Sequence, residues 1–147
     1  MDVRIIISGL DGTLSDPAHR IKLYKKKMYS EFNSAGKDDK PLQSICNILR
    51  SLNDLETYIV VCTALDDSCR EDTLSWLKLN EVPCAKLMMR RSGDNRSDAV
   101  VKKEMLDQLL ETYKFNQFWF ALEDRDMCVD MWRGEGLTCL QVAPGDF

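Results

Sequence analysis

Five short apolar runs, separated by amphipathic stretches, constrain the fold of this chain more than any other feature of its sequence. The runs cover residues 3–8, 58–62, 85–89, 118–122 and 137–142. They are apolar on both faces, as are strands that helices cover on both sides. Between them, residues 41–52, 68–79, 98–113 and 125–135 carry apolar side chains at helical spacing. We therefore expect an α/β domain with a central, parallel, five-stranded sheet flanked by helices.

The composition is typical of one folded domain that spans residues 1–147. The net charge of −4 argues against non-specific nucleic-acid binding through a broad basic surface, but it leaves a local basic patch open. The six cysteines form no Cys-x-x-Cys pair and His19 is the only histidine, so we expect reduced thiols and no zinc site. No stretch is typical of a signal peptide or a membrane span, and we expect a cytoplasmic protein.

Residues 16–39 interrupt the alternation of apolar runs and amphipathic stretches. This segment is strongly charged, with three consecutive lysines at residues 25–27 and the aromatic side chains of Tyr24, Tyr29 and Phe32 around them. One interpretation is a solvated helix and loop that lead into the next regular helix. The other is a flap or insert beside a functional site, where it contacts an anionic substrate. The sequence leaves both open.

Polar side chains gather where the predicted strands end. Ligands of open parallel sheets bind beyond the carboxyl ends of the strands, so these residues are candidates for one site. They are Gly9, Asp11 and Thr13 after the first run, Thr63 after the second, Arg90 after the third, Asp98 and Lys102 in the following helix, and Glu123 and Asp124 after the fourth. Their carboxylates, hydroxyl groups and cations suit a divalent metal and a phosphate. No Gly-x-x-x-x-Gly-Lys-Ser/Thr loop is present, which excludes nucleotide binding of the P-loop kind.

These residues resemble the haloacid dehalogenase (HAD) superfamily of phosphotransferases, whose first motif is D-x-D-G-T and stands here as GLDGT at residues 9–13. Three further blocks, GDNRSDAVVKKEM, EDRDMCVDMWR and CLQVAPGDF, are similar to the 3′-phosphatase domains of bacteriophage polynucleotide kinase-phosphatases. The resemblance covers residues 1–147 and includes no kinase domain. It implies a single Rossmann-like domain of the HAD type with a minimal cap, in which residues 16–39 are the flap.

The resemblance also implies a reaction, the Mg²⁺-dependent removal of a 3′-terminal phosphate through an aspartyl-phosphate. Asp11 matches the acid that protonates the leaving oxygen and later activates water. Thr63 matches the hydroxyl group that binds a phosphoryl oxygen. Lys102 matches the lysine that balances the negative charge around the phosphate, with Asp98 one helical turn before it on the same face.

The remaining site residues carry over in the same way. Arg20 and Arg90 match arginines near the substrate, where a guanidinium fork suits a phosphate. Asp124 and Glu123 match the acidic pair that holds Mg²⁺, together with Asp11. The resemblance thus assigns Mg²⁺ as the cofactor and 3′-phosphorylated DNA or RNA ends as the partner, in nucleic-acid repair. It implies a monomer or small homo-oligomer, in the host cytoplasm if the chain is phage-encoded, with no membrane association.

Three positions depart from the family pattern. Gly9 replaces the nucleophilic aspartate, which is also a metal ligand. Leu65 stands where the phage enzymes have an arginine, and Glu123 replaces an aspartate. Only the first departure removes the family mechanism, since loss of a covalent nucleophile costs several orders of magnitude in rate.

Three hypotheses about function follow. In the first, Gly9 is a single change in an otherwise active 3′-phosphatase, which the retention of the other site residues favours; Gly9→Asp should then restore or create activity. In the second, the chain is a natural pseudoenzyme that binds nucleic-acid ends or a protein, which Leu65 and Glu123 favour. In the third, the chain is a small-molecule or nucleotide phosphatase of the HAD type, because substrate choice depends on flap residues such as Lys25 and Tyr29.

Overall fold

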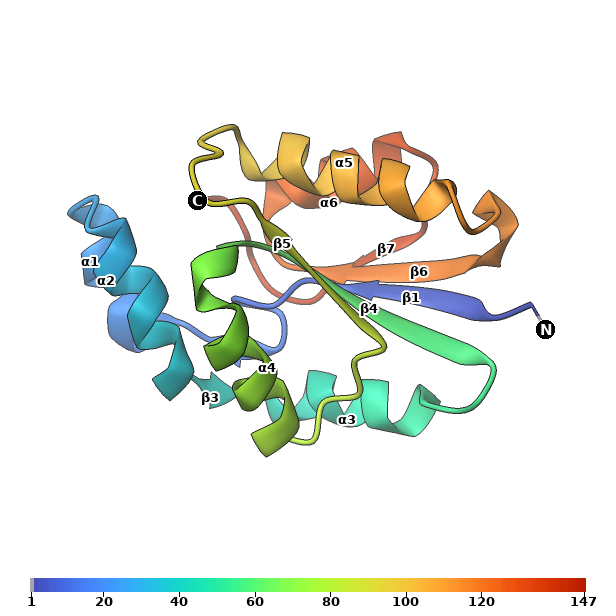
Figure 1. Ribbon diagram of the computed structural model, residues 1–147, viewed down its shortest axis with the longest axis horizontal. Coiled ribbons are helices and arrows are strands. Elements are labelled where there is room, and N and C mark those ends of the chain that lie inside the picture. Colours follow the sequence, from blue (N-terminus) through green and yellow to red (C-terminus); the bar gives the residue numbers. More distant parts are fainter. Residues whose placement is uncertain (1) are drawn as a thin grey trace.

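Five parallel strands form the central sheet of the computed structural model, which describes residues 2–147 (Figure 1). Their order in the sheet is β5-β4-β1-β6-β7. The strands are β1 (Arg4–Ser8), β4 (Thr57–Asp66), β5 (Lys86–Arg90), β6 (Phe118–Glu123) and β7 (Cys139–Gln141). The expected parallel five-stranded sheet is confirmed. Strand β4 is longer than predicted, because it continues through Thr63 to Asp66.

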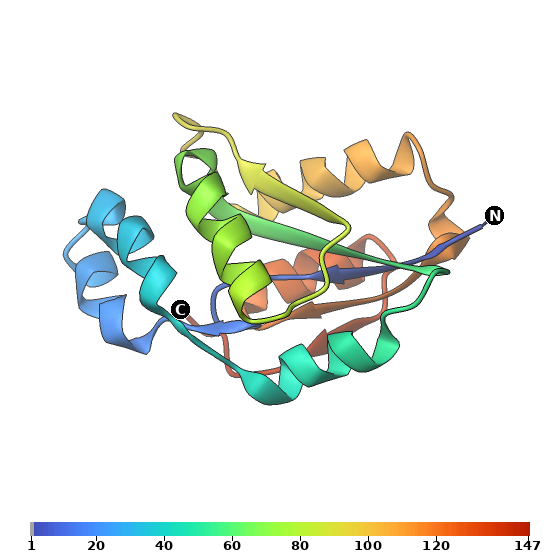
Figure 2. The same ribbon diagram turned by 60° about the horizontal axis from the view of Figure 1, so that its bottom comes forward.

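Helices cover both faces of this sheet, which explains why its strands are apolar on both sides. Helices α3 (Gln43–Leu52) and α4 (Arg70–Leu79) lie on one face, and α5 (Asp98–Leu110) and α6 (Asp126–Gly134) lie on the other (Figures 1 and 2). Short 3₁₀ helices, η3 (Asp67–Cys69) and η4 (Phe115–Gln117), precede α4 and β6. The side chain of Ser97 caps α5 by accepting a hydrogen bond from the Val100 amide. No helix within residues 2–147 has the length and apolar character needed to cross a membrane.

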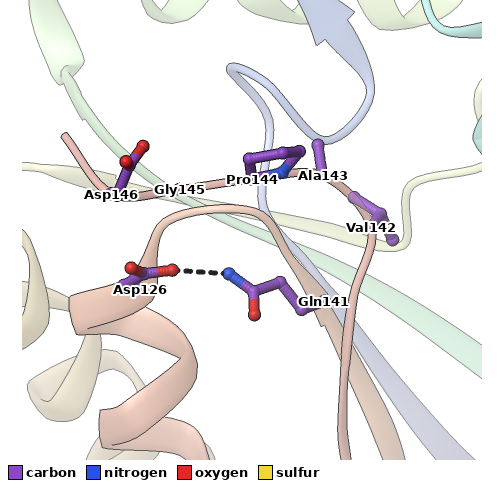
Figure 3. A pocket seen from close by; sticks show the side chains of 7 residues that line it. All are labelled: Asp126, Gln141, Val142, Ala143, Pro144, Gly145 and Asp146. Atoms are coloured by element: carbon purple, nitrogen blue, oxygen red, sulfur yellow. Dashed lines mark hydrogen bonds between the residues drawn. The ribbon is translucent and has the colours of Figure 1, made fainter.

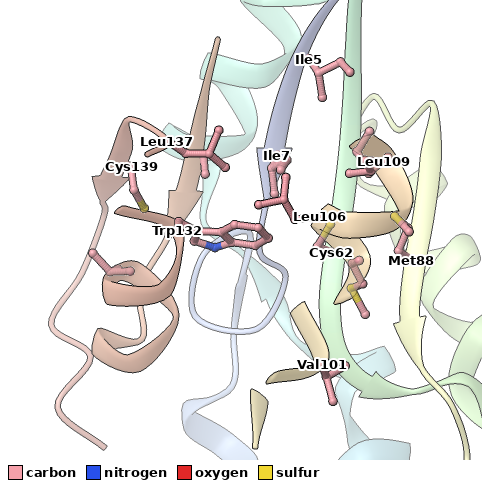
Figure 4. Packing of buried hydrophobic residues seen from close by; sticks show 14 residues of the cluster. Ile5, Ile7, Cys62, Met88, Val101, Leu106, Leu109, Trp132, Leu137 and Cys139 are labelled. Carbon is pink, nitrogen blue, oxygen red and sulfur yellow. The ribbon is translucent and has the colours of Figure 1, made fainter. Parts of the chain in front are cut away.

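The hydrophobic core has two halves, one on each face of the sheet. Along β1, Ile5 and Ile7 point to the half beneath α5 and α6, whereas Ile6 points to the half beneath α3 and α4. This alternation is the two-residue period of a strand. Figure 4 shows the first half, in which Trp132 of α6 packs among aliphatic side chains of the sheet and of α5. The core holds the carboxyl ends of β1, β4 and β6 at one edge.

Residues 16–39 form a helical insert beyond that same edge (Figures 1 and 2). It contains η1 (Ala18–Arg20), α1 (Ile21–Lys25), α2 (Tyr29–Ser34) and η2 (Ala35–Asp38). A small antiparallel sheet of β2 (Ser15–Asp16) and β3 (Lys40–Pro41) closes its base. The indole Nε1 of Trp76 in α4 donates a hydrogen bond of 2.8 Å to the carbonyl of Asp39, which anchors the insert to the main domain.

Candidate active site

The turn after β1 places Gly9 and Asp11 at the carboxyl edge of the sheet, beside the end of β6. The Gly9 amide donates to the carbonyl of Leu122 at 2.9 Å, so residue 9 lies next to Glu123. Gly12 has a φ of +80°, a conformation that favours glycine, and a Cβ there would lie 2.1 Å from Oδ2 of Asp124. Glycine at position 12 therefore lets the turn after β1 approach the side chain of Asp124 closely.

Thr13 and Thr63 present the hydroxyl groups of the site. Thr13 is fully buried, and its Oγ1 donates to Oδ1 of Asp124 at 3.0 Å, which orients that carboxylate. Thr63 is also buried near the end of β4, and its Oγ1 accepts a hydrogen bond from the Leu65 amide at 3.1 Å. The side chain of Leu65 is buried in the core, so it supplies neither a charge nor a hydrogen bond at the position where the resemblance implies an arginine.

Lys102 and Glu123 form a buried ion pair at the centre of this edge. Nζ of Lys102 lies 2.7 Å from Oε2 of Glu123, and the two side chains are only 7% and 2% exposed. The indole Nε1 of Trp132 donates to the same oxygen at 3.2 Å. Burial by itself lowers the pKa of Lys102, but the carboxylate of Glu123 outweighs it and the net pKa is raised. The lysine is therefore a fixed positive charge whose partner in this chain is Glu123.

Asp124 has no cationic partner within ion-pair distance among residues 2–147. Its side chain is almost fully buried, and burial followed by repulsion from Glu123 raises its pKa to about 6 from an ordinary value of 3.8. This carboxylate is the one in the site that remains available for a ligand of opposite charge.

Asp124→Asn is expected to stabilise the protein at neutral pH and much less in acid. Between pH values of 3.8 and about 6 the folded chain holds a proton that the unfolded chain has lost. The stability of the parent protein therefore falls as the pH rises through this window. A shift of about two pKa units corresponds to about 3 kcal/mol, a cost that a neutral asparagine avoids. Urea denaturation of both proteins in metal-free buffer, at about pH 4 and about pH 7.5, measures it. A stability difference that is equal at both pH values would contradict the prediction.

Asp11 lies on the side of the site that faces the insert. Its side chain is 29% exposed, and Oδ1 lies 2.8 Å from Nη2 of Arg20. Burial raises the pKa of Asp11 above its ordinary value, and Arg20 offsets this only in part. A carboxyl group with a raised pKa holds a proton more readily, which suits the general-acid role that the resemblance assigns to Asp11.

Arg20 is deeply buried, although the sequence places it among the substrate ligands. Its guanidinium makes a two-point contact with Asp39, at 2.8 and 2.6 Å, and stacks 4.2 Å from the ring centroid of Phe32. It is only 1% exposed. In the structure Arg20 therefore ties the insert to Asp11, and direct contact with a phosphate stays a prediction. No signal in the sequence identifies Asp39 as its partner.

Arg90 and Asp98 also meet, together with an arginine that the sequence analysis did not select. Nη2 of Arg90 lies 2.6 Å from Oδ1 of Asp98, and Nη1 of Arg125 contacts the other carboxylate oxygen. Arg90 further donates to the carbonyls of Ala64, Asp94 and Arg96. Both cations are engaged by Asp98, so a phosphate would have to compete for them. The position of Arg125 directly after Asp124 is a signal that could have identified it.

The carboxylates expected to hold Mg²⁺ do not form one ligand group. Within residues 2–147, no three His, Cys, Asp or Glu side chains are clustered as metal ligands. Asp11 faces Arg20 and Glu123 faces Lys102, which leaves the carboxylate of Asp124. Carboxylate oxygen is the donor that Mg²⁺ prefers, but a single free carboxylate does not make a complete site. The residues present therefore do not fit a tightly held magnesium ion.

Two depressions flank these residues. One is an open hollow beside the ends of β6 and β7, in which Gln141 donates a hydrogen bond of 2.7 Å to Asp126 (Figure 3). Since Asp126 and Asp146 both line it, this hollow is unfavourable for a phosphodiester chain. The other is a small cleft between the insert and the main domain, and Asp11, Lys37 and Leu65 are among its lining residues. The second cleft therefore leads to the candidate acid.

Comparisons with known proteins identify the family and relatives of the same fold. The family model described as "Polynucleotide kinase PNKP phosphatase domain" matches residues 3–147. A solved structure of a Pnkp1/Rnl/Hen1 complex is 30% identical, with a TM-score of 0.83 over 99% of this chain and 48% of that chain. A second, of the Pnkp1/Rnl/Hen1 RNA repair complex, is also 30% identical, with a TM-score of 0.82 over 99% of this chain and 44% of that one.

The chain thus spans about half the length of those two proteins. A haloacid dehalogenase-like hydrolase from Streptococcus pneumoniae shares the fold alone, at 14% identity, with a TM-score of 0.66 over 95% of this chain and 84% of that chain.

Proposed function

The chain belongs to the family of polynucleotide kinase PNKP phosphatase domains, and from this premise we propose that it recognises 3′-phosphorylated ends of DNA or RNA without removing the phosphate. One observation carries the proposal. Position 9 has no carboxylate, while Asp11, Thr63, Lys102 and Asp124 remain at the same edge of the sheet. These retained side chains support the binding of a phosphate, and Gly9 offers no group that could act as the nucleophile.

The missing group stops the family reaction at its first step. In that reaction a carboxylate oxygen at position 9 forms a bond to phosphorus while the bond from phosphorus to the 3′ oxygen breaks. Asp11 gives its proton to the departing 3′ oxygen and then takes a proton from the water that releases inorganic phosphate. The hydrogen side chain of Gly9 cannot form the covalent intermediate, and the carboxylate of Asp11 is engaged by Arg20 at 2.8 Å.

The exposed face of the insert supports a nucleic acid as the ligand. Lys25, Lys26 and Lys27 are all exposed at the end of α1. Tyr24 and Tyr29 lie beside them, also exposed, with ring centroids 5.5 Å apart. Lysines attract backbone phosphates, and aromatic rings stack on unpaired bases. A single-stranded 3′ end could therefore place its phosphate near Asp124 and its preceding nucleotides on the insert.

Magnesium has a limited role in this proposal. We infer weak binding of Mg²⁺ through Asp124, with water completing its coordination, because the other carboxylates have cationic partners. The ion would reduce repulsion between Asp124 and the terminal phosphate. It should therefore strengthen end binding without producing turnover.

We expect a 3′-phosphorylated single strand to bind more tightly than a nucleoside 3′-phosphate, with no release of inorganic phosphate. Its affinity should fall steeply with salt, by about 0.7 counterions per phosphate contacted. Titration of DNA and RNA oligonucleotides and of the mononucleotide at two salt concentrations, with Mg²⁺ or with a chelator, measures this. Neutralising Lys25, Lys26 and Lys27 with glutamine should weaken only the oligonucleotides.

The chain offers a matched control at the opposite edge of the sheet. Lys78 lies in the last turn of α4, Lys86 begins β5 and Lys114 precedes η4, and all three are exposed. Their replacement by glutamine removes the same charge and should leave end binding unchanged. Equal affinity for oligonucleotide and mononucleotide, without salt dependence, would instead favour a small-molecule ligand. Rapid phosphate release by the parent chain would show that another residue is the nucleophile.

A further inference from the structure

The space above Gly9 is occupied by the side chain of Glu123. A Cβ on Gly9 would lie 2.9 Å from Oε1 of Glu123 and 3.3 Å from its Cδ, and it would also lie 3.0 Å from Oγ1 of Thr13, a contact that a change at position 123 leaves in place. The two residues are neighbours because Ser8 of β1 pairs with Leu122 of β6, one position before each of them. The carboxylate of Glu123 therefore lies where a side chain at position 9 would extend.

This side chain is held firmly in that space. Oε2 of Glu123 accepts hydrogen bonds from Lys102 at 2.7 Å and from Trp132 at 3.2 Å. Oε1 accepts the amide of Asp124 at 3.3 Å. All of these groups are buried, and no unpartnered buried side-chain polar atom is found within residues 2–147. Both carboxylate oxygens of Glu123 thus accept hydrogen bonds, which fixes the position of this side chain beside Gly9.

The length of the side chain matters for this pairing. Aspartate at position 123 would be shorter by one methylene group, and its carboxylate would draw back from Lys102 by about 1.5 Å. The buried ammonium would then need another negative partner. Conversely, an aspartate at position 9 beside the present Glu123 would place two carboxylates in contact next to one lysine. Like charges at this distance cannot both ionise without a large cost.

We propose that Gly9 and Glu123 are one coupled exchange, in which Glu123 provides the negative charge for Lys102 that a carboxylate at position 9 would otherwise provide. Glu123 is then a positioning residue for Lys102, and the site is adapted to the loss of its nucleophile. The proposal rests on the proposed function only for its phosphatase readout. It implies that Gly9→Asp alone is insufficient for catalysis and that Gly9→Asp with Glu123→Asp is needed.

A double-mutant cycle tests the coupling without relying on activity. Thermal unfolding is measured for the parent, Gly9→Asp, Glu123→Asp and the double variant. Each single change should lower the melting temperature, one by crowding two carboxylates and the other by leaving Lys102 without a near partner. The double variant should melt at least about 4 °C above the value expected from adding the two losses. Additive losses would overturn the proposal.

Phosphate release from a 3′-phosphorylated oligonucleotide, with Mg²⁺ present, is measured for the same four proteins. The double variant should be at least about 100-fold faster than Gly9→Asp, and the other two should be inactive. Measurable phosphate release at equal rates by Gly9→Asp and by the double variant would overturn the proposal. Coupled stability with no activity in any of the four would uphold the coupled exchange and count against a 3′-phosphorylated end as the ligand in the proposed function.

A smaller side chain at position 9 keeps the test decisive if the proteins that carry Gly9→Asp do not fold. Gly9→Ala introduces the Cβ that meets Glu123, and it should be less harmful when Glu123→Asp withdraws the contacting oxygen. Gly134→Ala is the matched control, because a Cβ there meets no atom within 4 Å. Gly134→Ala should change the melting temperature equally in the parent chain and in the chain that carries Glu123→Asp. An equal effect of Gly9→Ala in both backgrounds would overturn the proposal.

Discussion

Lys102→Met is expected to lower the free energy of unfolding by about 3–5 kcal/mol, because it leaves the carboxylate of Glu123 buried and unpaired. Methionine has a similar length and keeps the packing of the lysine stem, so the loss reports on charge. The ion pair is almost inaccessible to solvent, with side-chain exposures of 7% and 2%. Urea denaturation at neutral pH, analysed by linear extrapolation, measures the change.

Two variants separate this effect from a general loss of helix stability. Lys103→Met changes the neighbouring lysine of α5, which is 38% exposed and pairs with Asp107 near the surface, and it should change stability little. Adding Glu123→Gln to Lys102→Met should recover much of the loss, because a neutral amide replaces the unpaired charge. A double variant as unstable as Lys102→Met would show that lost packing, rather than the buried carboxylate, dominates.

Arg20→Met is expected to destabilise the protein by a similar amount, about 3–5 kcal/mol, and to release the insert. The change leaves Asp39 without its two-point partner at a site where both side chains are only 1% exposed. It also removes the contact with Asp11 and the stacking on Phe32. Urea denaturation measures the loss, and amide hydrogen exchange should show residues 18–39 opening before the rest of the chain.

Arg96→Met provides the comparison for this variant. Arg96 also contacts two acids, Asp94 and Glu104, but its side chain is 50% exposed and water screens the pairs. The Arg96→Met substitution should therefore change the melting temperature little. Uniform protection of residues 18–39 in Arg20→Met would contradict the idea that Arg20 holds the insert on the main domain.

The architecture of this protein could be predicted from local patterns in its sequence. Each buried strand is an apolar run, and each covering helix carries apolar residues at helical spacing, so neighbouring residues are enough to identify them. Parallel strands alternating with helices then bring Gly9, Thr63 and Glu123 to one edge of the sheet. The absence of a carboxylate at position 9 is also visible in the sequence, because GLDGT differs from the family motif at its first residue.

The tertiary structure alone decided what the charged side chains do at that edge. Asp39 pairs with Arg20, and Arg125 joins Arg90 on Asp98, although no periodic pattern links any of these positions. The contact between Glu123 and the space above Gly9 joins the end of β6 to the turn after β1, more than a hundred positions away in the sequence. Such pairings depend on side-chain length and direction within a buried volume, where an unpaired charge is costly. A sequence shows which charges are present, but the fold determines which of them meet.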